Sequence, residues 1–300
     1  MHGMSVSDGN LFINSPIVSE AAPIVIGGIG GSGTRVVTQL LQSLGFDMGS
    51  DLNESLDDLG FTALFKRPSL WPLESHQIQL EQALRVYLNA RAQPYAKRST
   101  SNTEPDFDTT LNAIRREDSW IEAGKLEDRL TALCSSQTAT SPLWGWKEPN
   151  THLFLPFLLA AMPKLKYVHV VRHGLDMAHS RNQTQLNVWG KQLLNRAISA
   201  HSPDDSLAFW CATQERMMGI QAQTPSRVLI LRFESLFEEP QSTLASLGKF
   251  LNLDLGAQQV EYFILNLQKP TSFGRYKTHT KLEMTAGIRG LLTQLSYSVD

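Results

Sequence analysis

Apolar and polar positions follow two different periods along the first part of this chain. An unbroken apolar run at residues 24–27 predicts a short buried strand. From residue 34 onward, apolar side chains recur at helical spacing and share one face of a predicted helix: Val36, Val37, Leu40, Leu41 and Leu44. The period changes at a run of glycines, so the chain passes from strand to helix through a glycine-rich turn.

The same two patterns alternate along the rest of the sequence. Strands are predicted at residues 143–146, 165–171 and 227–231. Helices are predicted at residues 74–92, 109–134, 151–161, from about 176, 204–223, 240–251, 256–267 and 282–295, with a polar loop at 182–191. Strands separated by helices indicate an α/β fold with a central parallel sheet flanked by helices, whose ligand crevice lies at the carboxyl ends of the strands. The polar stretch 93–108 marks a helical insertion around residues 74–134.

Composition and charge narrow the class of protein. The chain has 300 residues, 42% of them hydrophobic, which suits a flexible N-terminus over residues 1–22 and one domain over 23–300. The balance of 27 basic and 29 acidic residues argues against a nucleic-acid partner, and no apolar run is long enough for a membrane span. Two cysteines without ligand or pairing spacing favour a reducing compartment. We therefore expect a cytoplasmic protein.

The glycine-rich turn has the chemistry of an anion site. A helix start exposes unpaired N–H groups and the positive end of the helix dipole, and glycines let the backbone close around a phosphate. Gly28 and Gly33 occupy the glycine positions of the nucleotide loop GxxxxGK[ST], but Thr34 replaces the lysine and Arg35 follows it. This makes an ordinary nucleoside triphosphatase less favoured. The alternative is a strand-to-helix connection without a ligand.

Two later segments place cationic side chains at predicted strand ends. Arg172 closes the strand at 165–171, and Ser180 follows eight positions later, so that both can meet one anion. Lys147 follows the short aromatic strand and precedes a helix. The alternatives are an ion pair of Arg172 with a neighbouring carboxylate, and a pair of Lys147 with Glu148 or a surface position.

Taken together, these segments resemble the sulfotransferase superfamily, closest in motif to its tyrosylprotein and carbohydrate branches. The resemblance rests on four stretches in the family's order: GGIGGSGTR, WGWKEPN, KYVHVVRHGLDMAHS and LILRFESLFEEPQSTLASLGKFLNLD. It implies a phosphate-loop-like fold and 3'-phosphoadenosine 5'-phosphosulfate as the donor. It also implies transfer of a sulfuryl group to a hydroxyl or amine without a metal ion.

The resemblance also assigns donor-binding residues. The first stretch corresponds to the family's 5'-phosphosulfate loop, which here consists of Gly30, Gly31, Ser32, Gly33, Thr34 and Arg35. Arg172 and Ser180 correspond to the 3'-phosphate site, and Arg275 to a late basic segment that closes over the nucleotide.

Catalytic roles follow from the same resemblance. Lys147 would neutralise the departing bridging oxygen. Related branches place a catalytic carboxylate soon after the loop helix, which makes Asp51 and Glu54 the first candidates for the base, with Asp57 and Asp58 as alternatives.

The sequence differs from the family pattern at two of these positions. Gly31 stands where a lysine or arginine usually precedes Ser-Gly-Thr, and Arg35 is the expected substitute for that charge. Phe233 stands where the family commonly has tyrosine.

Two other functions stay open at this stage. A nucleoside or sugar kinase would need Mg²⁺ and a carboxylate to hold it. A protein that only binds adenosine bisphosphate would not transfer sulfate. The acceptor is not specified by the sequence: a small molecule, a carbohydrate, a lipid or a peptide would each suit it.

Overall fold

A computed structural model describes residues 22–91, 107–116, 123–135 and 141–298 of the chain. The chain forms two compact units. The first comprises Met1–Ile26 and Val37–Lys166, and the second comprises Gly27–Val36 and Tyr167–Asp300. The glycine-rich turn therefore belongs to the second unit, although its neighbours in the sequence belong to the first. The N-terminal segment 1–22, expected to be flexible, lies almost wholly outside the described residues.

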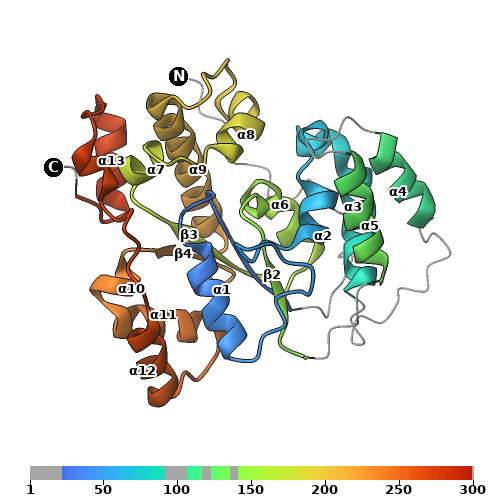
Figure 1. Ribbon diagram of the computed structural model, residues 1–300, viewed down its shortest axis with the longest axis horizontal. Coiled ribbons are helices and arrows are strands. Elements are labelled where there is room, and N and C mark those ends of the chain that lie inside the picture. Colours follow the sequence, from blue (N-terminus) through green and yellow to red (C-terminus); the bar gives the residue numbers. More distant parts are fainter. Residues whose placement is uncertain (1–21, 92–106, 117–122, 136–140, 299–300) are drawn as a thin grey trace. The chain divides into compact units, whose positions relative to one another are not determined.

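The sheet has four strands in the order β2-β1-β3-β4. They are β1 (Ile24–Gly28), β2 (Gly145–Lys147), β3 (Lys166–Val171) and β4 (Val228–Arg232) (Figure 1). In the first unit β1 and β2 run parallel, with Ile26 opposite Lys147. In the second unit β3 and β4 run parallel, with Val171 opposite Arg232. The predicted α/β class with a central parallel sheet flanked by helices is confirmed.

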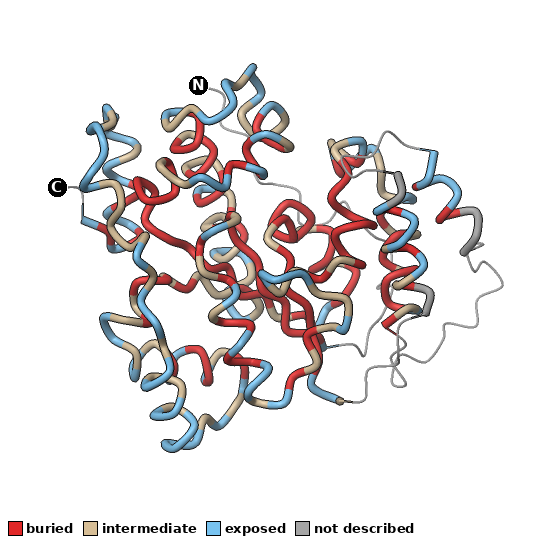
Figure 2. The backbone as a smooth tube through the Cα atoms, in the orientation of Figure 1, coloured by how far each residue is buried: buried red, intermediate tan, exposed pale blue. Residues whose placement is uncertain are grey.

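The strands are mostly continuous apolar runs, because helices cover the faces of the sheet. Every residue of β1 and β2 is buried, as are all residues of β3 after Lys166 (Figure 2). Such runs are typical of parallel strands shielded on both faces, whereas an exposed face would show alternation.

Short helices and 3₁₀ turns surround the first pair of strands. In chain order they are α1 (Thr34–Ser43), α2 (Leu59–Phe65), η1 (Pro68–Leu70), η2 (Leu73–His76), α3 (Gln77–Ala90), α4 (Phe107–Arg116), α5 (Ala123–Ser135) and α6 (Thr151–Ala161). Within the first unit, α2 packs against both α3 and α5. The described part of the insertion contains three helices where two were predicted: residues 109–134 belong to α4 and α5, and 92–106 and 117–122 lie outside the described residues.

The second unit is built around one long helix. Its elements are α7 (Gly174–Ala178), α8 (Thr184–Leu194), α9 (Pro203–Gln223), α10 (Ser235–Glu238), α11 (Pro240–Leu251), α12 (Ala257–Asn266), η3 (Arg275–Thr278) and α13 (Ala286–Gln294). Helix α9 packs against α7, α8, α13 and β4. Its first turn is capped by Ser202, whose hydroxyl accepts a hydrogen bond from the N–H of Asp205.

The polar loop predicted at 182–191 is wrong, because most of this segment is helix α8. Leu186 and Trp189, three positions apart, are buried on one face. Gln183 and Gln185, whose polarity suggested a loop, are buried too and form hydrogen bonds inside the protein. Polar side chains that point inward conceal the helical period from a hydropathy pattern.

In the described part of the chain, no helix is long and apolar enough to cross a membrane.

Candidate active site

The glycine-rich turn of the second unit forms an open backbone loop. Gly31 and Gly33 have φ angles of 95° and 98°, a region that residues with a side chain rarely adopt. A Cβ atom on Gly33 would also lie 2.1 Å from the ring of Phe233. Glycine is therefore required at this position by both conformation and space.

The buried hydroxyl group of Ser32 lies in this loop next to Gly28. The side chain is buried, and among the described residues its Oγ has no hydrogen-bond partner. The Ser32 N–H donates to the carbonyl of Ile29 at 2.9 Å, which closes the turn. A buried hydroxyl without a partner costs free energy unless a ligand supplies one. The loop thus fits an anion bound at the start of α1, where Thr34 is the first residue.

Ser180, which the resemblance assigns to the 3'-phosphate site with Arg172, lies beside this loop. A Cβ atom on Gly31 would lie 3.5 Å from the Ser180 hydroxyl oxygen. Arg35, in contrast, is exposed on the first turn of α1, and it forms no ion pair within the described residues.

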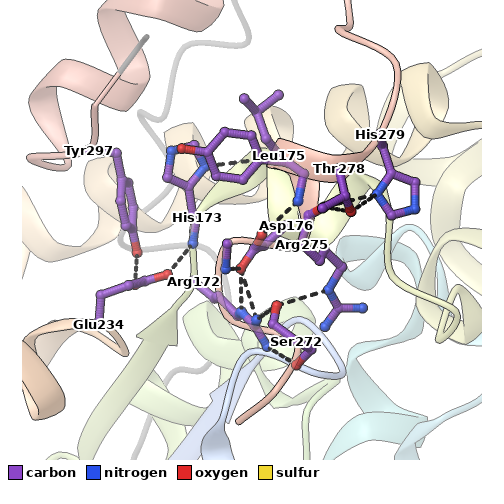
Figure 3. A network of polar contacts seen from close by, with 12 residues as sticks. Arg172, His173, Leu175, Asp176, Glu234, Ser272, Arg275, Thr278, His279 and Tyr297 are labelled. Carbon is purple, nitrogen blue, oxygen red and sulfur yellow. Dashed lines mark hydrogen bonds and ion pairs between the residues drawn. The ribbon is translucent and has the colours of Figure 1, made fainter. Parts of the chain in front are cut away.

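Arg172 is buried at the end of β3 in a polar network (Figure 3). Its Nη2 lies 2.8 Å from Oδ2 of Asp176, and its Nε also donates to that oxygen at 3.2 Å. Nη2 also donates to the carbonyl of Ser272, and Nη1 donates to the Ser272 hydroxyl at 3.2 Å. The expected alternative, an ion pair with a neighbouring carboxylate, is therefore present.

A second guanidinium approaches the same serine. Arg275 Nε donates to the Ser272 carbonyl at 3.2 Å. Burial lowers the pKa of Arg275, and the positive charge of Arg172 lowers it further. Two like charges around one carbonyl repel each other, so a bound anion between them would be stabilised by both. This arrangement brings together two of the predicted donor-binding residues.

Asp176 fastens the segment that carries Arg275. Besides Arg172, its carboxylate accepts hydrogen bonds from the N–H groups of Gly274 at 2.8 Å and Tyr276 at 3.2 Å. The ring of Tyr276 stacks on His173 with 4.7 Å between centroids. Sequence reasoning missed Asp176, although its place four residues after Arg172 at a helix start is a recognisable pairing signal.

In the first unit, Lys147 is the last residue of β2 and is almost fully buried. Its Nζ donates to the carbonyl of Ser55 at 2.5 Å and contacts the carboxylate of Asp57. The carboxylate partner of Lys147 is thus Asp57, whereas the sequence had suggested Glu148 as an alternative. Asp57 in turn accepts a hydrogen bond from Asn53 at 2.9 Å and remains partly open to solvent.

The other candidate carboxylates lie elsewhere in this segment. Asp51 pairs with Arg129 at 2.9 Å, and Glu54 is exposed. Asp58 caps α2 by accepting from the Phe61 N–H at 2.8 Å and also accepts from the Tyr87 hydroxyl at 2.9 Å. Among these four carboxylates, Asp57 is the one that the structure places at Lys147.

Glu148 adds a titratable group next to Lys147 in the sequence. Burial, together with the nearby negative charge of Asp57, raises the pKa of Glu148 to about 7. Both carboxylate oxygens accept hydrogen bonds from Asn150, one from its backbone N–H at 2.7 Å and one from its side chain at 2.6 Å. Perturbed carboxyl groups of this kind cluster at functional sites.

Fold and site together define an α/β protein with a glycine loop at the start of α1 and two guanidinium groups that meet at Ser272. A model of the sulfotransferase family matches residues 23–257, and the chain belongs to that family. It is therefore a sulfotransferase enzyme. A search of curated proteins finds no match.

Solved structures of similar fold are also sulfotransferases. The sulfotransferase domain of the Synechococcus PCC 7002 olefin synthase superposes with a TM-score of 0.51 at 13% identity, covering 96% of this chain and 98% of that one. The sulfotransferase domain from the curacin biosynthetic pathway gives 0.49 at 15% identity, covering 94% and 100%. Sulfotransferase STF1 from Mycobacterium tuberculosis H37Rv gives 0.43 at 16% identity, covering 93% and 77%. The first of these supports the fold.

Proposed function

We propose that this sulfotransferase takes its sulfuryl group from 3'-phosphoadenosine 5'-phosphosulfate and transfers it to a hydroxyl or amine. The observation that carries the proposal is the pair of anion sites in the second unit. One is the glycine loop with the unpartnered hydroxyl of Ser32, and the other is the pair of guanidiniums at Ser272. A nucleotide with a 5'-phosphosulfate and a 3'-phosphate carries an anion for each.

The residues of the second unit would share the work of binding. The loop N–H groups with Ser32 and Thr34 hold the 5'-phosphosulfate, as helix starts hold phosphates. Arg172, Ser180 and Arg275 hold the 3'-phosphate, and bidentate guanidinium contacts give this site its geometry. Gly31 contributes backbone only, and Arg35 is the side chain that could add charge from the first turn of α1.

The sulfuryl transfer itself would be catalysed by Lys147 at the end of β2 and its partner Asp57. The acceptor oxygen or nitrogen forms a bond to sulfur as the bond from sulfur to the bridging oxygen breaks, and adenosine 3',5'-bisphosphate leaves. Lys147 stabilises the negative charge on the departing oxygen. Asp57, which contacts Lys147 and remains open to solvent, takes the proton of the acceptor. Asp51 and Glu54 are the alternatives for that base.

Ligand discrimination tests the 3'-phosphate site. Arg172→Ala should weaken adenosine 3',5'-bisphosphate by about tenfold or more while changing adenosine 5'-monophosphate far less, because a charged hydrogen bond is lost only with the former. Isothermal titration calorimetry measures both affinities. Equal losses for the two nucleotides would contradict the assignment.

A turnover assay distinguishes the proposed sulfotransferase activity from a kinase and from a protein that only binds nucleotide. The wild-type protein should label an acceptor from a screen of hydroxyl and amine compounds when given donor with labelled sulfate, and chelation of Mg²⁺ should not abolish labelling. Phosphate transfer from ATP that requires Mg²⁺ would identify a kinase. Tight bisphosphate binding without labelling of any acceptor class would identify a binding protein.

A further inference from the structure

The side chain of Gln185 bridges the glycine loop. Its Nε2 donates to the carbonyl of Gly28 at 3.2 Å, and its Oε1 accepts from the N–H of Gly30 at 3.2 Å. Gln185 is buried in the first turn of α8. A primary amide can donate and accept at once, as a backbone peptide does, so one side chain satisfies two loop groups together.

The residue two positions earlier ties the same turn of chain to Ser180. Gln183 Nε2 donates to the Ser180 carbonyl at 2.6 Å, and Gln183 Oε1 accepts from the hydroxyl of Ser206 on α9 at 2.5 Å. The start of α8 therefore holds both the loop and the end of α7, where the Ser180 hydroxyl lies beside Gly31.

This bridge determines which loop groups remain for a ligand. With Gly30 engaged by Gln185, the N–H groups of Gly31 and Gly33 and the hydroxyl of Ser32 are left without a partner inside the described ranges. The positive φ of Gly31 disfavours any side chain there. The loop thus depends on fixed backbone dipoles in place of a basic side chain, and such dipoles act only if they are held in position.

The geometry points to Gln185 as the residue that positions the glycine loop for a 5'-phosphate or 5'-phosphosulfate group. This inference rests on the proposed function, because it concerns the same nucleotide site. Gln185 acts through the loop backbone and is a positioning residue.

Substitution by a side chain of similar size tests the role. Gln185→Met should weaken adenosine 5'-monophosphate by about tenfold or more, because two hydrogen bonds to the loop are lost. Adenosine 3'-monophosphate should change by no more than about threefold, since its phosphate does not use the loop. Calorimetry gives both affinities, and thermal unfolding checks that the variant is folded. Asn187→Met is the matched control, because Asn187 is exposed on the same helix.

A second variant tests the donor and acceptor requirement by pH. In Gln185→Glu the ionised carboxylate can accept from Gly30 but cannot donate to Gly28, and its charge repels the anion. The protonated carboxyl can do both. The affinity of this variant for adenosine 5'-monophosphate, relative to wild type at the same pH, should therefore recover as the pH falls from 8 toward 5.

The outcomes distinguish a failure of the proposed function from a failure of the role assigned to Gln185. A wild-type protein that binds neither adenosine bisphosphate nor the monophosphates overturns the proposed function. The role of Gln185 alone is overturned if the wild-type protein binds these nucleotides but Gln185→Met binds adenosine 5'-monophosphate as tightly as Asn187→Met does. It is also overturned if Gln185→Met loses equal affinity for the two monophosphates. If Gln185→Met does not fold, a Gln185→Glu affinity ratio that stays flat with pH overturns it.

Discussion

Lys147 is a charged side chain that the fold removes almost entirely from water. A buried ammonium is tolerated only with a good partner, and Asp57 together with the Ser55 carbonyl supplies one. The sequence permitted a pair with Glu148 or a surface position, and the structure shows neither. A buried, paired and positioned charge at a strand end is what a transition state with developing charge requires.

Removing Lys147 should therefore affect turnover more than binding. We expect Lys147→Ala to lower sulfuryl transfer by about a hundredfold or more, because one preorganised charge contact is lost where charge develops. The affinity for adenosine 3',5'-bisphosphate should stay within a few-fold of wild type. Lys147→Arg should restore activity only in part, since a planar guanidinium cannot occupy the position of an ammonium. Steady-state kinetics and calorimetry measure the two quantities.

Carboxamide variants of the neighbouring acids serve as the comparison. Asp57→Asn should lower turnover, whereas Asp51→Asn and Glu54→Gln should leave it near normal, because among these three carboxylates it is Asp57 that contacts Lys147 in the described structure. Near-normal turnover of Lys147→Ala would make Lys147 a structural partner of Asp57 and would transfer the catalytic role to Arg35.

At the scale of elements, one carboxylate binds two backbone N–H groups in and just before the 3₁₀ turn η3. Asp176 accepts from Gly274, Tyr276 and Arg172, while the rings of Tyr276 and His279 stack on His173 and His179. None of the residues of η3 is buried, so these polar contacts and ring stacks are what fasten the turn itself. The docking of Arg275 beside Arg172 thus depends on Asp176.

Neutralising Asp176 should loosen this segment. In Asp176→Asn one carboxylate oxygen becomes an NH₂ group that cannot accept, so at least one of the hydrogen bonds is lost. Trypsin should then cleave after Arg275 or Lys277 on the order of tenfold faster than in wild type, because local opening becomes more frequent. Mass spectrometry of timed digests identifies the cut. Asp254→Asn, at an exposed position, should digest at the wild-type rate; an unchanged rate in Asp176→Asn would show that stacking alone holds the segment.

At the scale of the whole molecule, the buried Glu148 makes stability depend on pH. Its pKa of about 7 lies above the ordinary value of 4.5, so the folded protein keeps a proton that the unfolded chain has released between these values. The unfolding free energy should therefore fall as the pH rises from about 4.5 to 7, by on the order of 1–3 kcal/mol from this group.

The Glu148→Gln variant should show a shallower fall over this range. Urea unfolding followed by tryptophan fluorescence at pH 5 and pH 8 gives the difference between the two free energies for each variant. Glu261→Gln, at an exposed position of α12, should retain the wild-type difference. An equally steep fall in Glu148→Gln would assign the pH dependence to other groups.

Much of the fold could be predicted from the sequence, because hydropathy period reports burial. The bounds of α6 and α11 agree with their predictions, and the predicted strands lie within two residues of β1 to β4. Helix α8 could not be found in this way, since its first turn buries glutamines that bond within the protein. Helix α2 was missed because its start lies in an acidic run typical of a solvated turn, although Asp58 in that run is its cap.

Only those candidate site residues that lie within a recognisable sequence motif could be predicted. The glycine loop, Arg172, Ser180 and Lys147 were named from three stretches of sequence, but several of the groups that hold the site together come from distant positions. Asp176 and Gln185 interact with residues about 100 and 155 positions away, and no local pattern reports such pairs. The resemblance to the tyrosylprotein and carbohydrate branches stays a prediction.

The separation of 155 residues between Gly30 and Gln185 also orders events during synthesis of the chain. At about 5–20 residues per second, the ribosome releases α8 roughly 8 to 30 s after the glycine loop. Through that interval the nascent polypeptide carries the glycine loop without the side chain that bridges it. On the proposed role of Gln185, a nucleotide would stabilise the chain only once the start of α8 has joined the loop.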